Sequence, residues 1–210
     1  RDSRQKEQYV EMICIESYIP KFLDMLYDKE IAKHLTIEEV RDAFHTNQIE
    51  SKKQASLAFE AVSGNANKVL YIGSWLGFLT RVLVEKYPSI NFYEVDMDTR
   101  CKEVSGRFNY TFKNYLGHQS ANIEDKNFNM WHEFDTIINL SCEHMSTNWY
   151  HKVASGTQLI IQSNNLVIDD HINNCESLDD FKSKYPLSKI HYDTTLELNV
   201  FNRFTLSGVK

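Results

Sequence analysis

Two glycines and an aspartate in this chain have the types and the spacing of a nucleoside-binding site. Gly73 and Gly77 follow the apolar run of residues 69–72. Gly73 would let the chain turn sharply, and Gly77 would let a helix pack closely on the sheet, with the free N–H groups of its first turn facing a ligand. Asp96 lies about twenty residues further on, where a ribose-binding carboxylate is expected. A turn without a ligand is the alternative, and Asp96 favours the bound nucleoside.

Polar residues also follow two later apolar runs, at residues 141–144 and 163–165. In an open α/β sheet a ligand lies outside the carboxyl ends of the strands, so these residues are expected near the glycine turn. Glu143 and His144 are candidate general bases, because histidine titrates near neutral pH and burial makes a glutamate more basic. Capping of a helix or hydrogen bonding to buried backbone groups remains the alternative for both. Cys142 is expected to pack rather than to act as a nucleophile, since adjacent side chains rarely face each other.

The same region contains residues that bind metals in other proteins. Magnesium prefers oxygen ligands, so Glu143, Asn165 and Asp169 would be its ligands here. His171 and Cys175 are four residues apart, a spacing that zinc could use, but no second ligand pair accompanies them. We therefore expect a site without a metal, with magnesium as the alternative.

The composition limits the classes of protein to which the chain can belong. Its 210 residues suit one domain with a large core, and 42% hydrophobic with 25% charged residues is typical of a globular protein. The net charge of -6 predicts no general attraction to nucleic acid. The four cysteines form no CxxC pair, and no apolar run approaches the ~20 residues of a membrane span. These features predict a cytoplasmic protein without a membrane segment or a secretory signal.

The first part of the chain has the pattern of several helices. Apolar residues recur at helical spacing over residues 9–27, and the sequence Thr36-Ile-Glu-Glu39 has the form of a capping box that opens a second helix. A third helix fits residues 51–62 and ends at Gly64, directly before the glycine-turn strand. We expect residues 1–65 to form a helical cap, which either closes over the ligand or only buries the edge of the sheet.

Strands and helices alternate over the rest of the chain. After the strand at residues 69–72, the apolar runs predict strands at residues 90–96, 114–121, 134–140 and 158–163, followed by a closing pair at residues 189–200 and 204–209. Alternation of this kind predicts a mostly parallel, doubly wound sheet with helices on both faces. The expected fold of residues 66–210 is therefore an α/β, Rossmann-like sheet of seven strands with an antiparallel C-terminal edge strand.

The order of these signals resembles the class I S-adenosylmethionine-dependent methyltransferases over residues 66–210. In that family the loop after the first strand holds the methionine part of the cofactor, the acid that ends the second strand binds the ribose, and a motif after the third strand contacts the adenine. Asp98 is a second candidate for the ribose. The cofactor-binding residues that the resemblance implies are Gly73, Ser74, Trp75, Gly77, Asp96, Met97, Asn122, Ile123 and Asn139.

The fourth strand leads to the acceptor side in that family, here residues 139–144, so Glu143 and His144 are the expected catalytic residues. The expected acceptor-binding residues are Asn164 and Asn165, whose paired amides can hydrogen-bond the edge of a planar acceptor, and Trp149, which can stack on it. S-adenosylmethionine would donate the methyl group and leave as S-adenosylhomocysteine. A small molecule or a protein side chain is favoured over nucleic acid, because no Asp-Pro-Pro-Tyr motif follows the fourth strand and the chain is acidic.

Two positions depart from the family pattern: Trp75 stands where a glycine is usual, and Tyr71 where an acid is usual. The missing glycine removes a point of close backbone approach, so the methionine end would be held differently or bound weakly. Residues 138–145 resemble a little-studied branch that is common in phages, which would place the protein in a host cytoplasm. Two alternatives stay open: aminocarboxypropyl transfer or lyase chemistry on the same cofactor, with a Gly-Ser turn similar to that of nicotianamine synthases, and a non-catalytic binding module. An NAD-type dehydrogenase fits the glycine spacing less well.

Overall fold

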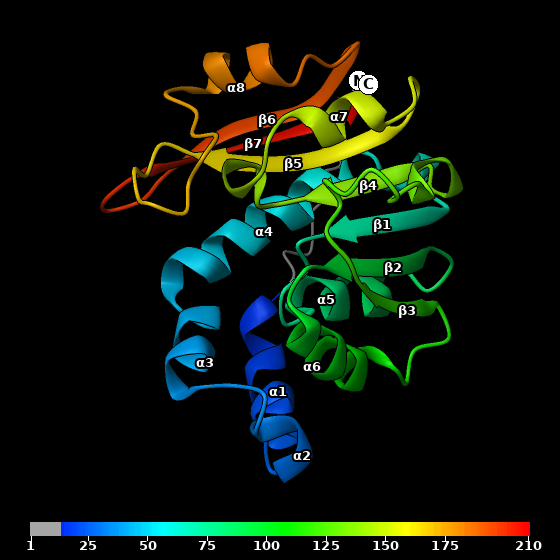
Figure 1. Cartoon of the computed structure of the whole chain (residues 1–210), viewed down its shortest axis with the longest axis vertical. Helices are drawn as coiled ribbons and strands as arrows, with labels where there is room; N and C mark the ends of the chain where they lie inside the picture. Colours follow the sequence, from blue (N-terminus) through cyan, green and yellow to red (C-terminus); the bar gives the residue numbers. More distant parts are fainter. Residues whose placement is uncertain (1–13) are drawn as a thin grey trace, which may run out of the picture.

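The apolar runs of the sequence pair into one sheet of seven strands (Figure 1). The computed structural model describes residues 14–210, so the expected start of the first helix at residues 9–13 lies outside the described part. The strands are β1 (Lys68–Ile72), β2 (Asn91–Asp96), β3 (Tyr115–Ser120), β4 (Thr136–Asn139), β5 (Gln158–Asn164), β6 (Lys189–Glu197) and β7 (Asn202–Val209).

The strands lie in the order β3-β2-β1-β4-β5-β7-β6 across the sheet. β1 to β5 are parallel to one another, and β7 runs antiparallel between β5 and β6. This topology confirms the predicted doubly wound, Rossmann-like sheet with an antiparallel C-terminal pair. The direction of winding reverses between β1 and β4, and the carboxyl ends of strands at such a point form a crevice that suits a ligand.

Helices precede the sheet and connect its strands. The N-terminal helices are α1 (Ile19–Met25), α2 (Lys29–Ala32), α3 (Ile37–Ala43) and α4 (Thr46–Glu60). The later helices are α5 (Phe78–Lys86), α6 (Thr99–Asn109), α7 (Asn148–Lys152) and α8 (Leu178–Lys184). Short 3-10 helices are η1 (Ile15–Tyr18), η2 (Ser63–Asn65), η3 (Met130–Glu133) and η4 (Cys142–His144). Within residues 14–210, no helix combines the length and the apolar character that crossing a membrane requires.

Two N-terminal helices differ from the sequence prediction. The described part of residues 9–27 is not one continuous helix, because Pro20 occupies the first turn of α1 and η1 precedes it. Proline has no N–H for an α-helical bond to the preceding turn, so a new helix begins there. The helix predicted to begin at residue 51 begins earlier, since the His45 side chain caps α4 by accepting the Asn47 N–H at 3.3 Å.

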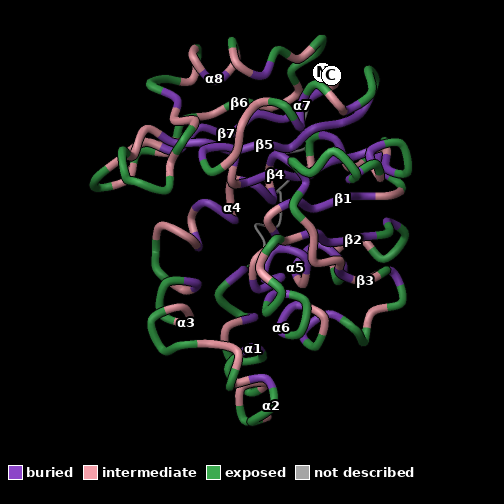
Figure 2. Tube along the Cα trace, viewed as in Figure 1, coloured by how far each residue is buried: buried purple, intermediate pink, exposed green. Residues whose placement is uncertain are grey.

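Both faces of the sheet are covered, so successive residues of a strand enter different cores. In β1, Leu70 and Ile72 face a cluster that includes residues of α7 and α8, whereas Val69 and Tyr71 face α4 and α5. The central strands are buried along most of their length, as Figure 2 shows. This two-sided burial explains why β1, β4 and β5 each contain an uninterrupted apolar run in the sequence.

The N-terminal helices pack on the outer side of α5 and α6 and form a third apolar cluster. The capping box predicted at the start of α3 is present: the Thr36 hydroxyl accepts the Glu39 N–H at 3.1 Å, and the Glu39 carboxylate accepts the Thr36 N–H at 2.7 Å. Edge-to-face and stacked aromatic rings fill the cluster, namely Phe22, Phe44, Phe78 and Phe108.

α4 is the helix that joins the N-terminal helices to the sheet (Figure 1). Its Ser51 hydroxyl donates to the Gln162 Oε1 at 2.7 Å, and the Gln162 Nε2 donates to the Ser51 carbonyl at 2.9 Å and to the Thr205 hydroxyl at 3.0 Å. These buried contacts fix α4 across β5 and β7. The division of the chain into residues 1–65 and residues 66–210 stays a prediction.

Candidate functional site

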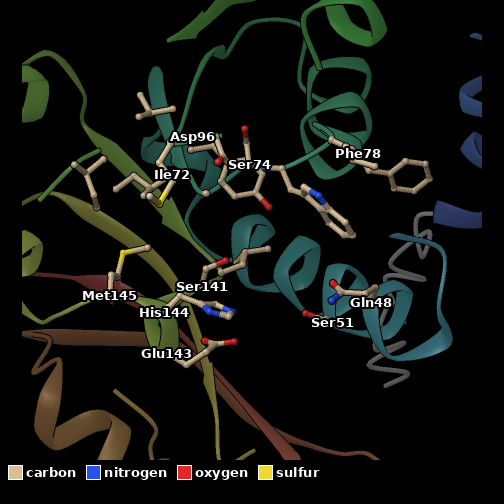
Figure 3. Close-up of a pocket in the computed structure, with 18 of the residues that line it drawn as sticks. Gln48, Ser51, Ile72, Ser74, Phe78, Asp96, Ser141, Glu143, His144 and Met145 are labelled. Carbon is tan, nitrogen blue, oxygen red and sulfur yellow. Dashed lines mark hydrogen bonds between the residues drawn. The ribbon is translucent and has the colours of Figure 1, made fainter. Parts of the chain in front are cut away.

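A cavity of about 530 Å³ opens at the carboxyl ends of β1, β2 and β4, where the winding of the sheet reverses (Figure 3). In the close-up, Ser74 and Asp96 lie on one side of it, and Glu143 and His144 lie on the other. Residues of α4 and Arg203 of β7 complete the lining. The cavity therefore lies where the strand topology predicts a ligand, and both groups of polar residues singled out in the sequence reach it.

The turn after β1 keeps the backbone of a glycine loop although it contains a tryptophan. Gly73 has φ 63° and Trp75 has φ 49°, both in the left-handed region that favours glycine. The Gly73 N–H donates to the Val95 carbonyl at 2.8 Å, which ties the turn to β2. The Ser74 hydroxyl is buried, lines the cavity and has no hydrogen-bond partner among the described residues. Trp75 thus preserves the path of the loop, and Ser74 has a free polar group for a ligand.

Asp96 ends β2 and is held by the same turn. Its Oδ2 accepts the Trp75 N–H at 2.9 Å, and its Oδ1 accepts the Asp98 N–H at 3.0 Å. Burial raises the pKa of the Asp96 carboxyl, and these backbone donors oppose the rise. Each oxygen has a further lone pair, so Asp96 can also accept hydroxyl groups of a ligand in the cavity. Asp98, the second candidate, instead caps α6 by accepting the Arg100 N–H at 2.9 Å.

Met97, Asn122 and Ile123 line the neighbouring end of the cavity. Met97 is exposed, whereas Ile123 is buried in the core on one face of the sheet. The Asn122 Oδ1 accepts the Glu124 N–H at 2.9 Å, and Glu124 in turn accepts the Ser146 N–H at 3.0 Å. These contacts join the loops after β3 and β4 into one rim. The apolar side chains of Met97 and Ile123, beside the side-chain amide of Asn122, suit a ligand with a flat ring and polar edges.

Gly77 serves the packing of two helices. It is the N-cap of α5 with φ 67°, and it is not among the residues that line the cavity. A Cβ at this position would lie 1.9 Å from the Ser105 Oγ and 2.7 Å from the Asn109 Nδ2, both on α6. The close packing predicted for Gly77 is therefore present, but its partner is α6 and not the sheet, and the expected cofactor contact has no support in this position.

Asn139 and Trp149 also lie outside the cavity lining. Asn139 is buried and shapes the loop after β4, because its Oδ1 accepts the Ser141 N–H at 3.0 Å and its Nδ2 lies 3.1 Å from the Met145 Sδ. Trp149 is 0% exposed and packs among other aromatic rings of the core. Its indole has no free face with which to stack on an acceptor, which removes the expected substrate contact.

Asn164 and Asn165 fix neighbouring segments instead of facing the cavity. Asn164 is buried, and its Nδ2 donates to the Glu143 Oε1 at 2.5 Å. The Asn165 Oδ1 accepts the Asn202 N–H at 2.7 Å, which links the end of β5 to the start of β7. The amide pair expected to bind the acceptor thus lies behind the acceptor side, where Asn164 positions Glu143.

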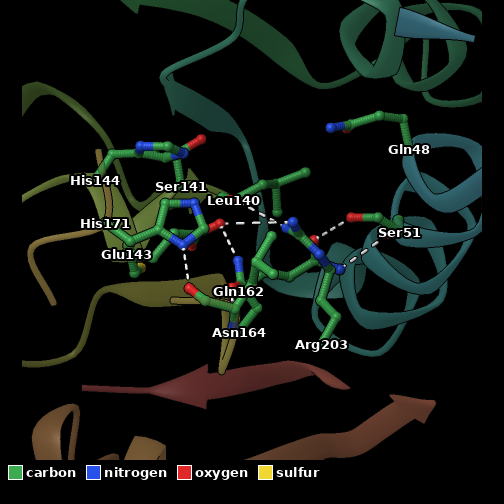
Figure 4. A network of polar contacts seen from close by, with 12 residues as sticks. Gln48, Ser51, Leu140, Ser141, Glu143, His144, Gln162, Asn164, His171 and Arg203 are labelled. Carbon is green, nitrogen blue, oxygen red and sulfur yellow. Dashed lines mark hydrogen bonds and ion pairs between the residues drawn. The ribbon is translucent and has the colours of Figure 1, made fainter. Parts of the chain in front are cut away.

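Glu143 and His144 line the cavity in η4, directly after β4 (Figure 4). Glu143 is buried, and its Oε1 lies 3.5 Å from the Arg203 Nη2. Its Oε2 is buried as well and has no partner among the described residues. His144 is exposed, and its Nδ1 lies 3.2 Å from the Asp170 carbonyl oxygen. Both candidates for a general base therefore face the cavity, and their catalytic role stays a prediction.

Lys52 and Arg203 are charged cavity residues that the sequence did not identify. Lys52 is buried on α4, and its Nζ donates to the Gln48 Oε1 at 3.2 Å. Burial, and then the positive charge of Arg203, lowers the pKa of Lys52 to about 7. Arg203 donates to the Leu140 carbonyl at 3.3 Å. The helical periodicity could have identified Lys52 as a buried residue, because Ala55, three residues later, lies on the same buried face of α4.

One group of side chains within residues 14–210 is arranged like the ligands of a metal ion. Glu143, His144 and His171 offer ligand atoms that all lie within 4.8 Å of one another. Asp169 and Cys175, which the sequence suggested for magnesium and for zinc, do not belong to this group. Cys175 is instead buried in the core beside β5.

The sequence matches no protein-family model, and it matches no curated protein. Solved structures with a similar fold include EvdMO1, which is 12% identical with a TM-score of 0.59 over 76% of this chain and 41% of that chain. The alignment thus covers less than half of EvdMO1. The N-terminal domain of EvdMO1, solved in the presence of SAH and D-fucose, is 12% identical with a TM-score of 0.58 over 94% of this chain and 97% of that domain.

A third similar structure is the S-adenosylmethionine-dependent methyltransferase SibL in its apo form. It is 11% identical with a TM-score of 0.58, and the alignment covers 93% of this chain and 73% of SibL. At such identities the similarity concerns the fold alone. The sheet order, the antiparallel β7 and the helices on both faces therefore give this chain the Rossmann-like fold of the class I methyltransferases.

Proposed function

We propose that the protein is an S-adenosylmethionine-dependent methyltransferase whose acceptor is a small polar molecule. The observation that carries this proposal is one cavity that joins Asp96 and the turn after β1 to Glu143 and His144 after β4. In the class I fold this is the position at which a ligand meets the carboxyl ends of the strands. The cofactor would occupy the end near Asp96, and the acceptor the end near Glu143.

The residues at the first end fit the three parts of S-adenosylmethionine. Asp96 would accept the ribose hydroxyls, and Met97 and Ile123 would hold the adenine by apolar contact. Ser74, with a buried hydroxyl that has no partner among the described residues, would donate to the methionine carboxylate. S-adenosylmethionine supplies a methyl group on a sulfonium, which is already electrophilic. The protein then has to hold an acceptor in line with the bond that breaks.

The other end contains groups that can take a proton from an acceptor. Lys52 is the strongest candidate, because a pKa of about 7 leaves a large neutral fraction at neutral pH. Glu143 and His144 are the further candidates. α4 lines the cavity with Gln48, Ser51 and Lys52, and a cavity of about 530 Å³ favours a small molecule over a protein side chain. The D-fucose used with the N-terminal domain of EvdMO1 makes a sugar-sized acceptor a reasonable first choice.

Calorimetric titration with S-adenosylmethionine, S-adenosylhomocysteine and NAD tests the cofactor. We expect the two adenosyl compounds to bind and NAD not to bind. Incubation with S-adenosylmethionine and a panel of sugars, phenols and thiols, followed by mass spectrometry, tests the reaction. S-adenosylhomocysteine together with an acceptor heavier by one methyl group is the expected product pair.

Other products would identify the other functions. Methylthioadenosine in place of S-adenosylhomocysteine would show that a different bond of the cofactor breaks, as in aminocarboxypropyl transfer. Failure of all adenosyl compounds to bind would refute the methyltransferase proposal and favour a non-catalytic binding module. NAD binding alone would point to a dehydrogenase.

A further inference from the structure

Two histidines and a buried glutamate meet at the acceptor end of the cavity (Figure 4). Glu143 and His144 come from η4, and His171 comes from the segment between β5 and α8. Their ligand atoms lie within 4.8 Å of one another, and the centroids of the two imidazole rings are 4.6 Å apart. Side chains from two loops at the carboxyl ends of neighbouring strands thus converge on one point.

Both histidines make an outer contact that leaves one ring nitrogen available. The Nδ1 of His144 lies 3.2 Å from the Asp170 carbonyl oxygen, and the Nδ1 of His171 lies 2.7 Å from the Leu166 carbonyl oxygen. A carbonyl oxygen can only accept, so in the neutral rings each Nδ1 carries the proton and each Nε2 presents a lone pair. Hydrogen bonds of this kind orient the histidine ligands of metal sites.

Glu143 supplies a third available atom. Its Oε1 is held by the Asn164 amide at 2.5 Å and lies 3.5 Å from the Arg203 guanidinium. Its Oε2 is buried without a partner among the described residues, in a side chain that is itself nearly inaccessible. A buried acceptor without a hydrogen bond is unfavourable, so this oxygen is suited to a ligand.

Backbone contacts lock the two loops together. The Glu143 carbonyl accepts the Ile172 N–H at 2.9 Å and the Asn173 N–H at 3.0 Å. The Asn173 side chain donates to the carbonyls of Cys142 at 3.3 Å and Met145 at 3.2 Å. The segment that carries His171 is therefore fixed against the loop that carries Glu143, so the backbone keeps the three side chains near one another.

We propose that Glu143, His144 and His171 bind a divalent transition-metal ion, with zinc as the expected ion. Two imidazoles and a carboxylate suit zinc, whereas magnesium takes oxygen ligands. Ligands about 2.1 Å from a tetrahedral zinc ion lie about 3.4 Å from one another, so ligand atoms that now lie within 4.8 Å have to approach one another by at most about 1.4 Å. His144 is exposed and can make this movement. Arg203 reduces the attraction for a cation, so we expect an affinity below that of structural zinc sites.

Three protein ligands leave a coordination position open, which is the arrangement of catalytic zinc. Glu143 and His144 line the cavity, so that position faces the acceptor end. This role rests on the proposed function. An acceptor hydroxyl or thiol that binds the ion would lose its proton to solvent, because the ion lowers the pKa of its ligand. The lone pair of that oxygen or sulfur would form the bond to the methyl carbon while the bond from that carbon to the sulfonium sulfur breaks, and S-adenosylhomocysteine would leave with a neutral thioether sulfur.

Metal binding to the untagged chain, in the absence of cofactor, tests the site. After treatment with a chelator, the protein is titrated with Zn²⁺ in competition with a chromophoric chelator, and with Co²⁺ while the visible absorption is recorded. We expect one ion per chain and the strong visible absorption of four-coordinate cobalt. The variants His144→Ala, His171→Ala and Glu143→Gln should each weaken zinc binding at least about tenfold. His151→Ala, which changes an exposed histidine on α7, is the matched control and should bind as the wild type does.

Two results would overturn the metal site: wild-type protein that binds no zinc, or site variants that bind zinc as tightly as His151→Ala. Circular dichroism shows whether a variant has unfolded, and His144→Ala alters an exposed side chain and so is the variant least able to disturb the fold. A parallel titration with S-adenosylmethionine separates the two proposals. Cofactor binding without zinc binding refutes the metal site alone, whereas zinc binding without cofactor binding refutes only the methyltransferase.

Discussion

Trp75 shows how a bulky residue can occupy the place of a loop glycine. A left-handed backbone costs an ordinary residue roughly 1–2 kcal/mol relative to glycine. The charge-assisted hydrogen bond from the Trp75 N–H to Asp96 offsets part of this cost. The indole packs against the apolar cluster of the N-terminal helices, with the Lys52 Nζ 5.9 Å from the centroid of its ring. Asp96 and the N-terminal helices therefore hold the turn in shape from two sides.

Asp96→Ala tests the cofactor end of the cavity. The variant loses the carboxylate that would accept the ribose hydroxyls, so we expect S-adenosylmethionine to bind about 1–3 kcal/mol more weakly in calorimetry. Asp96→Asn keeps one oxygen that can accept a backbone N–H. Its affinity for S-adenosylmethionine should therefore lie between those of the wild type and Asp96→Ala. The matched control is Asp24→Ala on α1, an exposed aspartate that does not line the cavity. Wild-type affinity in a folded Asp96→Ala protein would remove Asp96 from the cofactor site.

Residues whose role depends on local spacing could be found from the sequence, and those whose role depends on packing could not. Gly73 and Asp96 follow directly from strand ends, and both reach the cavity. Asn164 and Trp149 also stand next to predicted elements, but the direction of their side chains is decided by the core into which each element packs. The sequence does not mark Lys52 as a site residue, because a charged residue in a helix is usually exposed.

At the scale of elements, the start of α5 meets α6 at Gly77. No side chain fits there, since an added Cβ would overlap the Ser105 Oγ, and the backbone φ of 67° also favours glycine. The contact fixes how the helix after the turn lies beside the helix after β2. It thereby sets the positions of the two strand ends that hold Gly73 and Asp96.

Gly77→Ala should lower the free energy of unfolding by roughly 2–4 kcal/mol, because the strain of a left-handed alanine adds to the overlap with α6. Denaturant unfolding measures this change. Gly64→Ala is the matched control: a Cβ there meets nothing within 4 Å, so its effect should stay within about 0.5 kcal/mol or be slightly stabilising. Equal effects of the two substitutions would contradict the close contact between α5 and α6.

The elements were largely predictable because two-sided burial gives an unambiguous signal. β4 and β5 are buried along their whole length and β1 from its second residue, and each contains an uninterrupted apolar run. The capping sequence at Thr36 marks the start of α3. Short elements escape such signals. The 3-10 helix η4, which presents Glu143 and His144, has three residues, too few for any periodic pattern. The loop after β5 also contacts η4. The two segments lie far apart in the sequence, so no local sequence pattern predicts this contact.

At the scale of the whole molecule, α4 both covers the sheet and lines the candidate site, whereas the sequence left these as alternative roles of the N-terminal helices. It packs on β5, β6 and β7, so it buries the sheet. The same helix contributes Gln48, Ser51 and Lys52 to the cavity lining. The N-terminal helices therefore form a wall of the candidate site as well as a cover for the sheet.

Two buried ionisable groups couple the stability of the whole fold to pH. Glu94 of β2 accepts hydrogen bonds from the hydroxyls of Thr80, Ser105 and Tyr115, the last at 2.9 Å. Burial nevertheless raises the pKa of Glu94 to about 7 from 4.5, whereas burial lowers the pKa of Lys52 to about 7 from 10.5. Both groups favour their neutral forms in the folded state, and each charged form weakens the fold.

The two groups act in different pH windows. For Glu94 the folded state binds the proton more tightly than the unfolded state, so its contribution to stability is complete below pH 4.5 and is lost as the pH rises through 7. For Lys52 the unfolded state binds the proton more tightly, so its contribution is complete above pH 10.5 and is lost as the pH falls through 7. The sum of these two contributions to the free energy of unfolding is lowest near pH 7.

Glu94→Gln should remove the loss of stability that the ionisation of Glu94 causes as the pH rises from 4.5 to 7. The amide keeps an oxygen that accepts the hydroxyl donors, but it does not titrate. The unfolding free energy of the variant minus that of the wild type should therefore rise by about 3 kcal/mol between pH 4.5 and pH 7. Urea unfolding at several pH values measures this. Glu103→Gln, an exposed site on α6, should leave the pH dependence unchanged. If Glu94→Gln retained the wild-type slope, the buried carboxyl would not be the origin of the pH dependence, and the polar contacts among β2, β3, α5 and α6 would have to stabilise a charged Glu94.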